Sequence, residues 1–505
     1  MKSLAVPLVL LTALSALPRV RAQEEPFDFE TLRFHAKRLA AQPYQPRPSQ
    51  VPKFLLDLSY DEHRRIRFNP DRTWWRDERL PFQLQFFHPG FIFNHTVQLH
   101  EVANRRVRDI PFDRSRFIYD HVDLAGSIPD TMGFTGFRVL YDLNKPGDEL
   151  GAFLGASYFR LLCKKAVYGL SARGLTVNTA EPGGEEFPVF EKFWVQKPAP
   201  DARDLVVFAL LDSPSVAGAY RLVILPGATT VVRVRAAIYR RTEDKVIGLA
   251  PLTSMFWHGE NSRTAHRDFR PEVHDSDDLL LQRGSGEWLW RPLVNPDQLR
   301  VAAFADENPR GFGLLQRDRD FEHFQDLEAN YHLRPSVWVE PVGAWGGGAV
   351  RLVEIPAPDE TSDNIVAFWV PASLPPLDEP LEFEYRLFWS LEASRRPPAG
   401  YAAATRLSGV LKQPELTRFL VDFDGPYLNG QPADPTIEPV VTVGAGAGLV
   451  PDTVTIQKNP NNGTWRVTFA VKPDGSGRAV ELRCFLRKTT HVGSLTETWS
   501  YLWNP

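Results

Sequence analysis

Five ionisable side chains fall within seven positions of the segment RPEVHDSDDLL, residues 270–280: Glu272, His274, Asp275, Asp277 and Asp278. A zinc site needs several His or Cys ligands, and this segment has one His and no Cys. A calcium loop needs alternating acidic residues, a glycine turn and a later Glu; Asp275 and Asp277 alternate, but the glycine is missing. We therefore predict no metal here. Taken alone, the segment fits a loop of solvated carboxylates.

A second acidic loop, PAPDETSDNIVAFWVP (residues 356–371), carries Asp359, Glu360 and Asp363 directly before an apolar run. Cleavage of a glycosidic bond needs two carboxyl groups, one to protonate the leaving oxygen and one to activate water or attack carbon. Aromatic rings and arginines suit a sugar chain, because sugar faces stack on rings and hydroxyls bond to charged groups. Candidates near the two loops are Trp257, Trp288, Trp290, Tyr331, Trp338, Trp345, Arg270, Arg291 and Arg334. The alternative, core tryptophans and capping turns, is favoured by composition alone.

The elements that must position these residues are predicted to be strands. Apolar residues recur at period two in short runs that end in Gly, Pro, Asn or Asp. In TVVRVRAAIYRR, residues 230–241, the positions Val232, Val234, Ala236 and Ile238 face one way and the arginines between them the other, as in a half-buried antiparallel strand. With 43 prolines and 34 glycines, this pattern predicts an all-β sandwich architecture. One short helix is expected within FDFETLRFHAKRLAAQPY, ending before Pro43.

The strand-like runs divide the chain into two predicted domains. Residues 23–390 hold too many of them for a small sandwich, so we expect two large packed sheets there. The stretch LEASRRPPAGYAAAT mixes charge, Pro, Gly and small residues, which places a linker at residues 391–402. Residues 403–505 contain about seven strands, the size and pattern of an immunoglobulin-like sandwich. No cysteine pair marks an antibody-type domain there.

The totals limit the compartment and the partners. The 505 residues include 58 Lys and Arg against 62 Asp and Glu, which argues against nucleic acid or an anionic membrane as the main partner. Residues 1–22 have a lysine, an apolar run too short to span a membrane and a Val-Arg-Ala end, the pattern of a secretory signal cleaved after Ala22. Two distant cysteines, Cys163 and Cys484, are interpreted as buried free thiols. An exported chain of this size without a disulfide framework suits the bacterial periplasm.

At seven segments the sequence resembles a known family. They are LAPLTSMFWHGEN, RPEVHDSD, GEWLWRPL, NPRGFGLLQRDRDF, LRPSVWVEP, ETSDNIVAFW and LTETWSYLW. The resemblance is to the osmoregulated periplasmic glucan biosynthesis proteins G and D (OpgG/OpgD), and it runs from FDFETL to the C-terminus. The lack of a twin-arginine signal makes the chain more similar to the G branch. The resemblance implies a large galactose-mutarotase-like β-supersandwich followed by a small immunoglobulin-like β-sandwich.

The resemblance also implies an inverting hydrolase or transglycosylase acting on the β-1,2-glucan backbone. The general acid of the family, in the motif ET-x-DN, falls on Asp363, and the general base, the first aspartate of HDSD, falls on Asp275. Asp363 must carry a proton in order to donate it. Asp275 must stay ionised to draw a proton from water, directly or through a relay of hydroxyls. The sequence departs from the family at Asp278, where glycine is expected, and at Ser362, where asparagine is expected; neither change removes a proposed catalytic carboxyl.

The expected substrate-binding residues have two sources. Tyr331 and Glu360 match family positions near the cleft, whereas Trp290 and Arg270 follow from the aromatic and arginine content of the loops. No cofactor is expected. The expected partners are β-1,2-linked glucan, the membrane glucan synthase and a second copy of the chain as a homodimer, and none is a nucleic acid. The alternatives are a non-catalytic glucan-binding or scaffolding protein and, by fold analogy alone, a mutarotase-like epimerase. Three histidines are interpreted as structural: His88, His95 and His100.

Overall fold

The structure is a computed structural model that describes residues 26–505 except 48, 121–123, 125, 261–267, 393–396, 398, 434–435 and 491–492. The expected secretory signal, residues 1–22, lies outside the described residues. Among the described residues, strands greatly outnumber helices, so the expected all-β class is confirmed at the level of secondary structure. None of the described helices is both long enough and apolar enough to cross a membrane.

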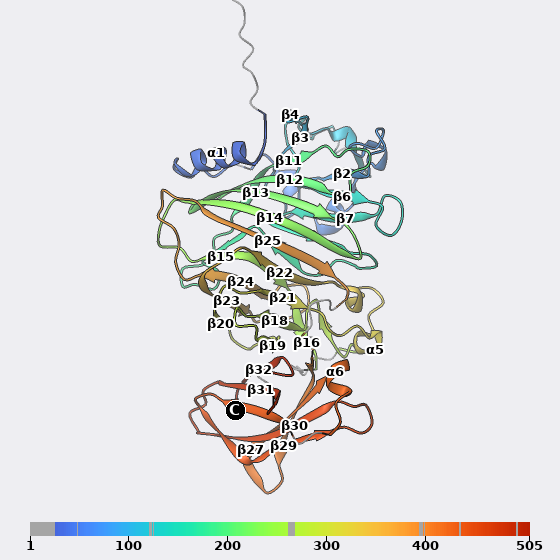
Figure 1. Cartoon of the computed structure of the whole chain (residues 1–505). Helices are drawn as coiled ribbons and strands as arrows, with labels where there is room; N and C mark the ends of the chain where they lie inside the picture. Colours follow the sequence, from blue (N-terminus) through green and yellow to red (C-terminus); the bar gives the residue numbers. More distant parts are fainter. Residues whose placement is uncertain are drawn as a thin grey trace, which may run out of the picture.

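The longest described helix is the one expected from the sequence. Helix α1 spans Phe29–Ala40, and the carboxylate of Asp28 caps it by accepting a hydrogen bond from the backbone N–H of Thr31 at 3.0 Å. Its buried face packs against β12, β13 and β14, on the outside of the larger sheet (Figure 1). The other described helices are single turns: α2 (Lys53–Leu56), α3 (Tyr60–His63), α5 (Phe321–Phe324), α6 (Pro426–Asn429) and the 3-10 helices η1 (Pro70–Arg72), η2 (Arg114–Arg116) and η3 (Tyr331–Leu333).

One large sheet contains ten described strands and carries the candidate site at one end. Its order is β2-β6-β7-β8-β9-β15-β24-β23-β20, and β10 pairs beside β15. The strands are β2 (Phe82–Phe87), β6 (Gly136–Tyr141), β7 (Glu149–Leu154), β8 (Tyr158–Leu161), β9 (Ser171–Arg173), β10 (Leu175–Val177), β15 (Ile247–Ser254), β24 (Ile365–Pro371), β23 (Gly347–Glu354) and β20 (Arg300–Glu307). All of the described neighbouring pairs in this sheet are antiparallel, which explains why alternating burial was readable from the sequence.

The second large sheet has fourteen described strands in the order β28-β31-β32-β19-β18-β21-β22-β25-β14-β13-β12-β11-β3-β4. Their bounds are β28 (Ile437–Val443), β31 (Val480–Lys488), β32 (Thr498–Trp503), β19 (Trp288–Pro292), β18 (Asp278–Gln282), β21 (Gly311–Leu315), β22 (Ser336–Val342), β25 (Leu381–Ser390), β14 (Thr229–Arg240), β13 (Val216–Leu225), β12 (Leu205–Asp212), β11 (Val189–Gln196), β3 (Gln98–Ala103) and β4 (Arg106–Asp109). On β14 the four predicted apolar positions are buried, and Arg233 is exposed. The main hydrophobic core lies between the two sheets.

The C-terminal part has seven described strands, the number expected from the sequence. Four of them form their own sheet in the order β26 (Tyr401–Val410), β27 (Gln413–Asp424), β30 (Trp465–Pro473) and β29 (Ala447–Lys458). They share a hydrophobic cluster with β28, β31 and β32. This part forms the orange and red region at the bottom of Figure 1. Strand β32 pairs in parallel with β19, Trp290 opposite Trp499, so the fourteen-stranded sheet continues from the large part into the C-terminal part.

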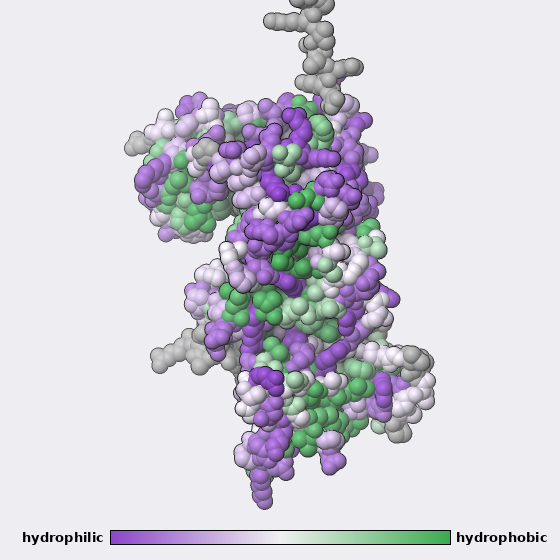
Figure 2. Space-filling view, turned by 90° about the vertical axis from the view of Figure 1, so that its left-hand side faces the viewer, coloured by the Kyte–Doolittle hydropathy of each residue, from purple (hydrophilic) through white to green (hydrophobic). Residues whose placement is uncertain are grey.

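Two short strand pairs complete the described fold: β1 (Ile66–Phe68) with β5 (Phe117–Tyr119), and β16 (Phe256–His258) with β17 (Val273–His274). Cys163 and Cys484 are buried free thiols, as predicted. The molecular surface mixes hydrophilic and hydrophobic residues and is hollowed on one side below the upper part (Figure 2).

Candidate active site

Asp275 and Asp363 are brought to the same end of the ten-stranded sheet by neighbouring strands. Strands β15 and β24 pair with Ser254 opposite Ile365, and Asp363 lies two residues before β24 begins. Asp275 directly follows β17, and its backbone N–H donates to the carbonyl of Met255, the residue after β15. Both acidic loops therefore start from one pair of strands, although they are far apart in the sequence.

The side chain of Asn364 links the two loops further. It is buried, its Oδ1 accepts from the N–H of Phe256 at 2.8 Å, and its Nδ2 donates to the carbonyl of Phe256 at 2.9 Å. Phe256 in turn pairs with His274 across β16 and β17. The residue after Asp363 is thus connected through one strand to the residue before Asp275. The side-chain amide of Asn364 thus bonds the N–H and the carbonyl of Phe256, as the backbone of a neighbouring strand would.

The charge of Asp363 affects the pKa of Asp275. Burial raises the pKa of Asp275, the guanidinium of Arg334 lowers it, and the charge of Asp363 raises it again. Asp275 is only 4% exposed and its Oδ1 forms a short ion pair with Nη1 of Arg334. A carboxylate in this setting remains paired with a cation while its proton affinity is increased, which suits a general base.

Asp363 is more open to solvent than Asp275. Its side chain is 35% exposed, and its Oδ2 lies 3.4 Å from Nη2 of Arg160 on β8. The guanidinium of Arg160 is itself oriented by Ser171 on β9, whose Oγ accepts from Nε at 2.5 Å. One carboxyl of the pair is therefore buried and the other reachable by a ligand.

Arg270 and Glu360, two of the predicted binding residues, contact each other. Oε2 of Glu360 lies 2.5 Å from Nη2 of Arg270, which also pairs with Asp268 at 2.8 Å, while Nη1 pairs with Asp326 at 2.9 Å. The hydrogen bond from Arg270 lowers the pKa of Asp268 to about 2. One guanidinium thus joins three loops, including the one that carries Asp363. Its evident structural effect is to hold those loops together.

Tyr331, the third predicted binding residue, lies beside this group. The guanidinium carbon of Arg334 sits 4.1 Å from the centre of its ring, and burial raises the pKa of its hydroxyl. The charges of Glu360 and Asp275 act on the same hydroxyl. Tyr331 is 2% exposed and packs with Met255, Val273 and Phe324.

Trp290 stands apart from the aspartate pair. It lies on β19, pairs with Trp499 and belongs to the hydrophobic cluster of the C-terminal part. The guanidinium carbon of Arg317 lies 5.6 Å from its ring centre. The described contacts thus place Trp290 in the packing between β19 and β32. The sequence had predicted that Trp290 binds the sugar.

The acidic segment 270–280 is divided by its own strands. Of its five ionisable residues, Asp275 pairs with Arg334, while Glu272 accepts a hydrogen bond at 2.7 Å from Nε2 of His274. Asp278, where the family resemblance led us to expect glycine, is 1% exposed and lies 3.0 Å from Nε of Arg317. Burial raises the pKa of Asp278 well above its usual range. The short spacing of these residues in the sequence could not predict that each has a different partner.

The sequence analysis did not single out the arginine and tyrosine residues on the outer face of the ten-stranded sheet. Besides Arg160, this face carries Arg138, which pairs with Glu149 at 3.0 Å, and Tyr168, whose hydroxyl donates to the same carboxylate at 2.7 Å. The available signal was alternation: in ASYFRLLC, Arg160 lies between two buried residues, Phe159 and Leu161, and so had to face outward. Its partner could not be read from that pattern.

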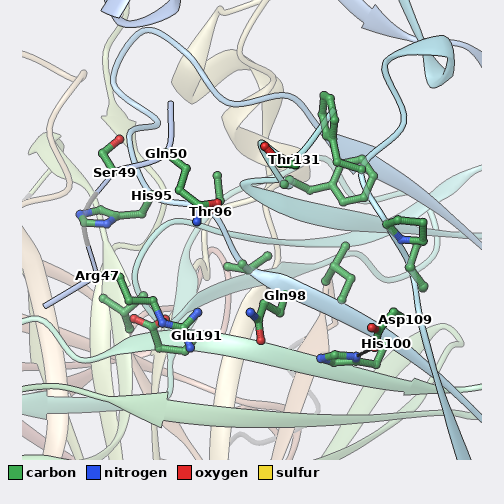
Figure 3. Close-up of a pocket in the computed structure, with 18 of the residues that line it drawn as sticks. Arg47, Ser49, Gln50, His95, Thr96, Gln98, His100, Asp109, Thr131 and Glu191 are labelled. Atoms are coloured by element: carbon green, nitrogen blue, oxygen red, sulfur yellow. Dashed lines mark hydrogen bonds and ion pairs between the residues drawn. The ribbon is translucent and has the colours of Figure 1, made fainter. Parts of the chain in front are cut away.

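A separate pocket of about 500 Å³ lies at the other end of the molecule, near β3 and β11 (Figure 3). Its lining includes His95 and His100, and Nδ1 of His100 lies 2.7 Å from Asp109. His88 does not line it. Nδ1 of His88 donates to the carbonyl of Pro89 at 2.6 Å, and burial lowers its pKa to about 4. His88 is thus held structurally, as interpreted from the sequence, although it also lines a second pocket beside β1 and β2. His95 and His100 line the first pocket.

The fold and site define a β-rich protein of two packed sheets whose exposed sheet face, rich in arginine and carboxylate, suits a polyhydroxylated ligand. The chain belongs to the family of the periplasmic glucan biosynthesis protein MdoG, whose family model matches residues 27–503. The chain is 46% identical over 489 residues to glucans biosynthesis protein G of Ralstonia nicotianae, covering 95% of this chain and 96% of that protein.

Two further relatives carry the same name. The protein G of Rhodopseudomonas palustris strain BisA53 is 44% identical over 508 residues, covering 98% of this chain and 99% of the relative. That of Pseudomonas aeruginosa strain PAO1 is 42% identical over 505 residues, covering 98% and 96%. The resemblance to the OpgG/OpgD family stated from seven sequence segments is therefore confirmed, and it extends over nearly the whole chain. The similarity to the G branch, which was inferred from the lack of a twin-arginine signal, is confirmed as well.

Proposed function

We propose that this protein cleaves or rearranges the β-1,2-linked backbone of periplasmic glucans as an inverting hydrolase or transglycosylase. The family supports the substrate class, because its members are named for periplasmic glucan biosynthesis. The single observation that carries the catalytic proposal is the pairing of β15 with β24 together with the hydrogen bond from Asp275 to Met255, which start both acidic loops from one end of the ten-stranded sheet. Inversion requires a pair of carboxyl groups, with room between them for a water molecule or an acceptor hydroxyl.

The two carboxyl groups take different roles in this proposal. Asp363 is the exposed member and, when protonated, donates its proton to the leaving glycosidic oxygen. Asp275 is the buried member; its ion pair with Arg334 favours the ionised form, and burial increases its proton affinity. Asp275 takes a proton from the attacking water or sugar hydroxyl, directly or through a hydroxyl relay. The hydroxyl of Tyr331 lies near the charges of both Glu360 and Asp275. Tyr331 and Glu360 are therefore proposed to bind the sugar.

Positions further from the pair are also part of the proposal. Arg270 holds the loops around the site, and Trp290, which packs between β19 and β32, is proposed as a sugar contact away from the aspartate pair. The proposed fold names are a galactose-mutarotase-like supersandwich over residues 23–390 and an immunoglobulin-like sandwich over 403–505. The proposed linker, residues 391–402, follows the end of β25 at Ser390 and overlaps the first two residues of β26, which starts at Tyr401. We also propose that residues 1–22 export the chain to the periplasm and that the mature chain contacts the membrane glucan synthase and forms a homodimer.

The test is product analysis on defined linear β-1,2-glucan, with the anomeric configuration of the products followed by NMR. The wild-type chain should shorten the glucan with inversion, and Asp363→Asn should lower turnover at least about 100-fold, because a general acid contributes that much or more. Asp378→Asn, an exposed carboxylate in the loop before β25, is the matched control and should leave turnover unchanged. Retention of configuration, or full turnover in Asp363→Asn, would refute the assignment.

A non-catalytic glucan-binding role is the second candidate, and one observation favours it. Both carboxyl groups of the pair already have an arginine partner, Arg334 for Asp275 and Arg160 for Asp363. These ion pairs fix the position of each carboxylate, which suits binding of a sugar without cleavage. This candidate predicts that the wild-type chain binds linear β-1,2-glucan without producing new reducing ends. The same product analysis, run beside a binding measurement, separates the two functions.

A further inference from the structure

A second group of ionisable residues lies in its own cavity, beyond the acidic strand that leads to Asp275. The cavity measures about 270 Å³ and is bounded on one side by Glu272, Asp318 and His323, and on the other by β26 of the C-terminal part. The proposed catalytic pair does not line this cavity, and of the residues proposed for the glucan only Trp290 does. Binding of an ion here can therefore be tested without glucan cleavage.

Three side chains converge in this cavity with the atoms that a metal ion needs. One ligand atom each from Glu272, Asp318 and His323 lies within 4.8 Å of the other two. Ligands of one zinc ion stand about 2.0–2.2 Å from it at tetrahedral angles, so two of them are about 3.3–3.6 Å apart. The ligand atoms of the three side chains therefore need to approach one another by up to about 1.5 Å, which a change of side-chain torsion angles supplies. Glu272 is rigidly held, since its side chain is 7% exposed and bonded to His274.

The same cavity holds two further carboxyl groups, Asp277 and Asp278, that lie close together with few donors around them, a place that a shared proton or a bound cation would fill. Asp278 lines it with a side chain 1% exposed, and its Oδ1 accepts no hydrogen bond from the part of the chain that the structure describes. Oδ1 of neighbouring Asp277 is likewise buried without a donor there. The nearest guanidinium, Arg317, is shared between Asp278 and the fully buried Glu497. Buried carboxylates without sufficient donors are stabilised by bound cations.

We propose that Glu272, Asp318 and His323 bind one divalent transition-metal ion of the zinc type. One imidazole nitrogen with two carboxylate oxygens suits Zn²⁺ or Mn²⁺ better than Ca²⁺ or Mg²⁺, which take oxygen ligands. The ion joins the segment before β17 to the loop around α5, which are separated by more than forty positions in the sequence. Because Glu272 lies three residues before Asp275, the ion also fixes the strand that leads to the proposed base.

The metal-free alternative is a network of ion pairs. Nδ1 of His323 forms a short contact with Oδ2 of Asp318, and a protonated His323 would satisfy both carboxylates without an ion. The two arrangements differ in what they do with added metal. The ion-pair network gives no saturable binding site that depends on His323.

The first experiment titrates Zn²⁺ into the chelator-treated mature chain by calorimetry. We expect one saturable site per chain, and His323→Ala should weaken it at least about 100-fold, the upper end of the loss seen when a residue supporting a metal ligand is removed. The His323 side chain is 48% exposed, so its removal is compatible with folding. His35→Ala, an exposed histidine on α1, is the matched control and should bind as the wild type does. No saturable Zn²⁺ binding, or equal binding by His323→Ala, overturns the proposal.

The second experiment locates the ion without any variant. A crystal of the mature chain soaked in Zn²⁺ should give an anomalous peak between the side chains of Glu272, Asp318 and His323. A parallel soak in Mg²⁺ should leave that position without the metal. Anomalous peaks only at other positions overturn the proposal even if calorimetry detects binding. Neither experiment depends on glucan cleavage, so failure of one proposal is distinguishable from failure of the other.

Discussion

At the scale of single residues, the environment of Asp275 decides the chemistry. A carboxylate that is 4% exposed would favour its neutral form, yet a general base must be ionised. Arg334 resolves this conflict by pairing with Asp275 directly, while the charge of Asp363 acts in the opposite direction. The working pKa of Asp275 is therefore a balance of three effects, of which burial is the largest.

Removing the guanidinium of Arg334 should lower the stability of the folded chain. Arg334→Gln leaves Asp275 buried without a countercharge, and breaking one partner of a buried pair costs about 3–5 kcal/mol. The folded-state pKa of Asp275 already lies above its ordinary value of 3.8, and the variant raises it further. The folded state then binds a proton more tightly than the unfolded state, so the penalty should be full near pH 7 and shrink as the pH falls toward 3.8.

The measurement is urea unfolding of the wild type and Arg334→Gln at several pH values. Adding Asp275→Asn to Arg334→Gln should recover much of the lost stability at neutral pH, because the uncompensated charge is then gone. A loss that is the same at every pH, or that the double variant does not relieve, would show that Arg334 stabilises the fold by packing alone.

At the scale of elements, the candidate site depends on the side chain of Asn364, which forms hydrogen bonds that backbone groups form in a sheet. Asn364 bonds both the N–H and the carbonyl of Phe256, and Phe256 pairs with His274. Strands β24, β16 and β17 are thereby fixed relative to one another, and so are the two loops that follow or precede them. Arg270 adds a second connection by pairing with carboxylates of three loops.

Asn364→Ala should therefore loosen the aspartate pair without touching either carboxyl group. Two backbone groups of Phe256 lose their partner, at about 1–3 kcal/mol for each unsatisfied group. We expect faster hydrogen exchange at Phe256 and His274 and a fall in glucan turnover. Asn295→Ala, which removes a comparable pair of hydrogen bonds to Ala357, is the control and should leave exchange at Phe256 unchanged. Unaltered protection of Phe256 in Asn364→Ala would contradict this account.

At the scale of the whole molecule, the large and C-terminal parts are joined by more than the predicted linker. Strand β32 extends the fourteen-stranded sheet beside β19, and the buried guanidinium of Arg317 bonds both Asp278 of the large part and Glu497 of the C-terminal part. Glu497 also accepts from the backbone N–H of Ala402 at 2.8 Å. The C-terminal part is thus docked through a continuous sheet and a buried ionic cluster.

Arg317→Met should undock the two parts. The substitution leaves two buried carboxylates without their shared cation, and a loss of about 3–5 kcal/mol is expected for such a broken pair. Because the cluster lies between the parts, the loss should appear as a separate early unfolding transition of the C-terminal strands. Tryptophan fluorescence followed beside circular dichroism would detect it as two transitions that do not coincide. Coincident transitions with unchanged midpoints would mean that the sheet pairing alone holds the parts together.

The sequence by itself determined the local features of this protein. Period-two apolar runs predicted the β class, the facing of residues on β14 and the number of C-terminal strands, because burial of alternate side chains is a local property of a strand. Helix α1 followed from its spacing and its position before Pro43. Motif segments were long enough to give the family without any coordinates.

Only the tertiary structure decided which ionisable groups act together. Pairing of β15 with β24 and the bonds of Asn364 bring Asp275 toward Asp363, while the same short acidic segment sends Asp278 to Arg317 and Glu272 to His274. It likewise set Trp290 against Trp499 and joined the C-terminal strands to the large sheet. The physical reason is that charge coupling and burial depend on distances across the fold, which strand order fixes and which spacing along the chain does not encode.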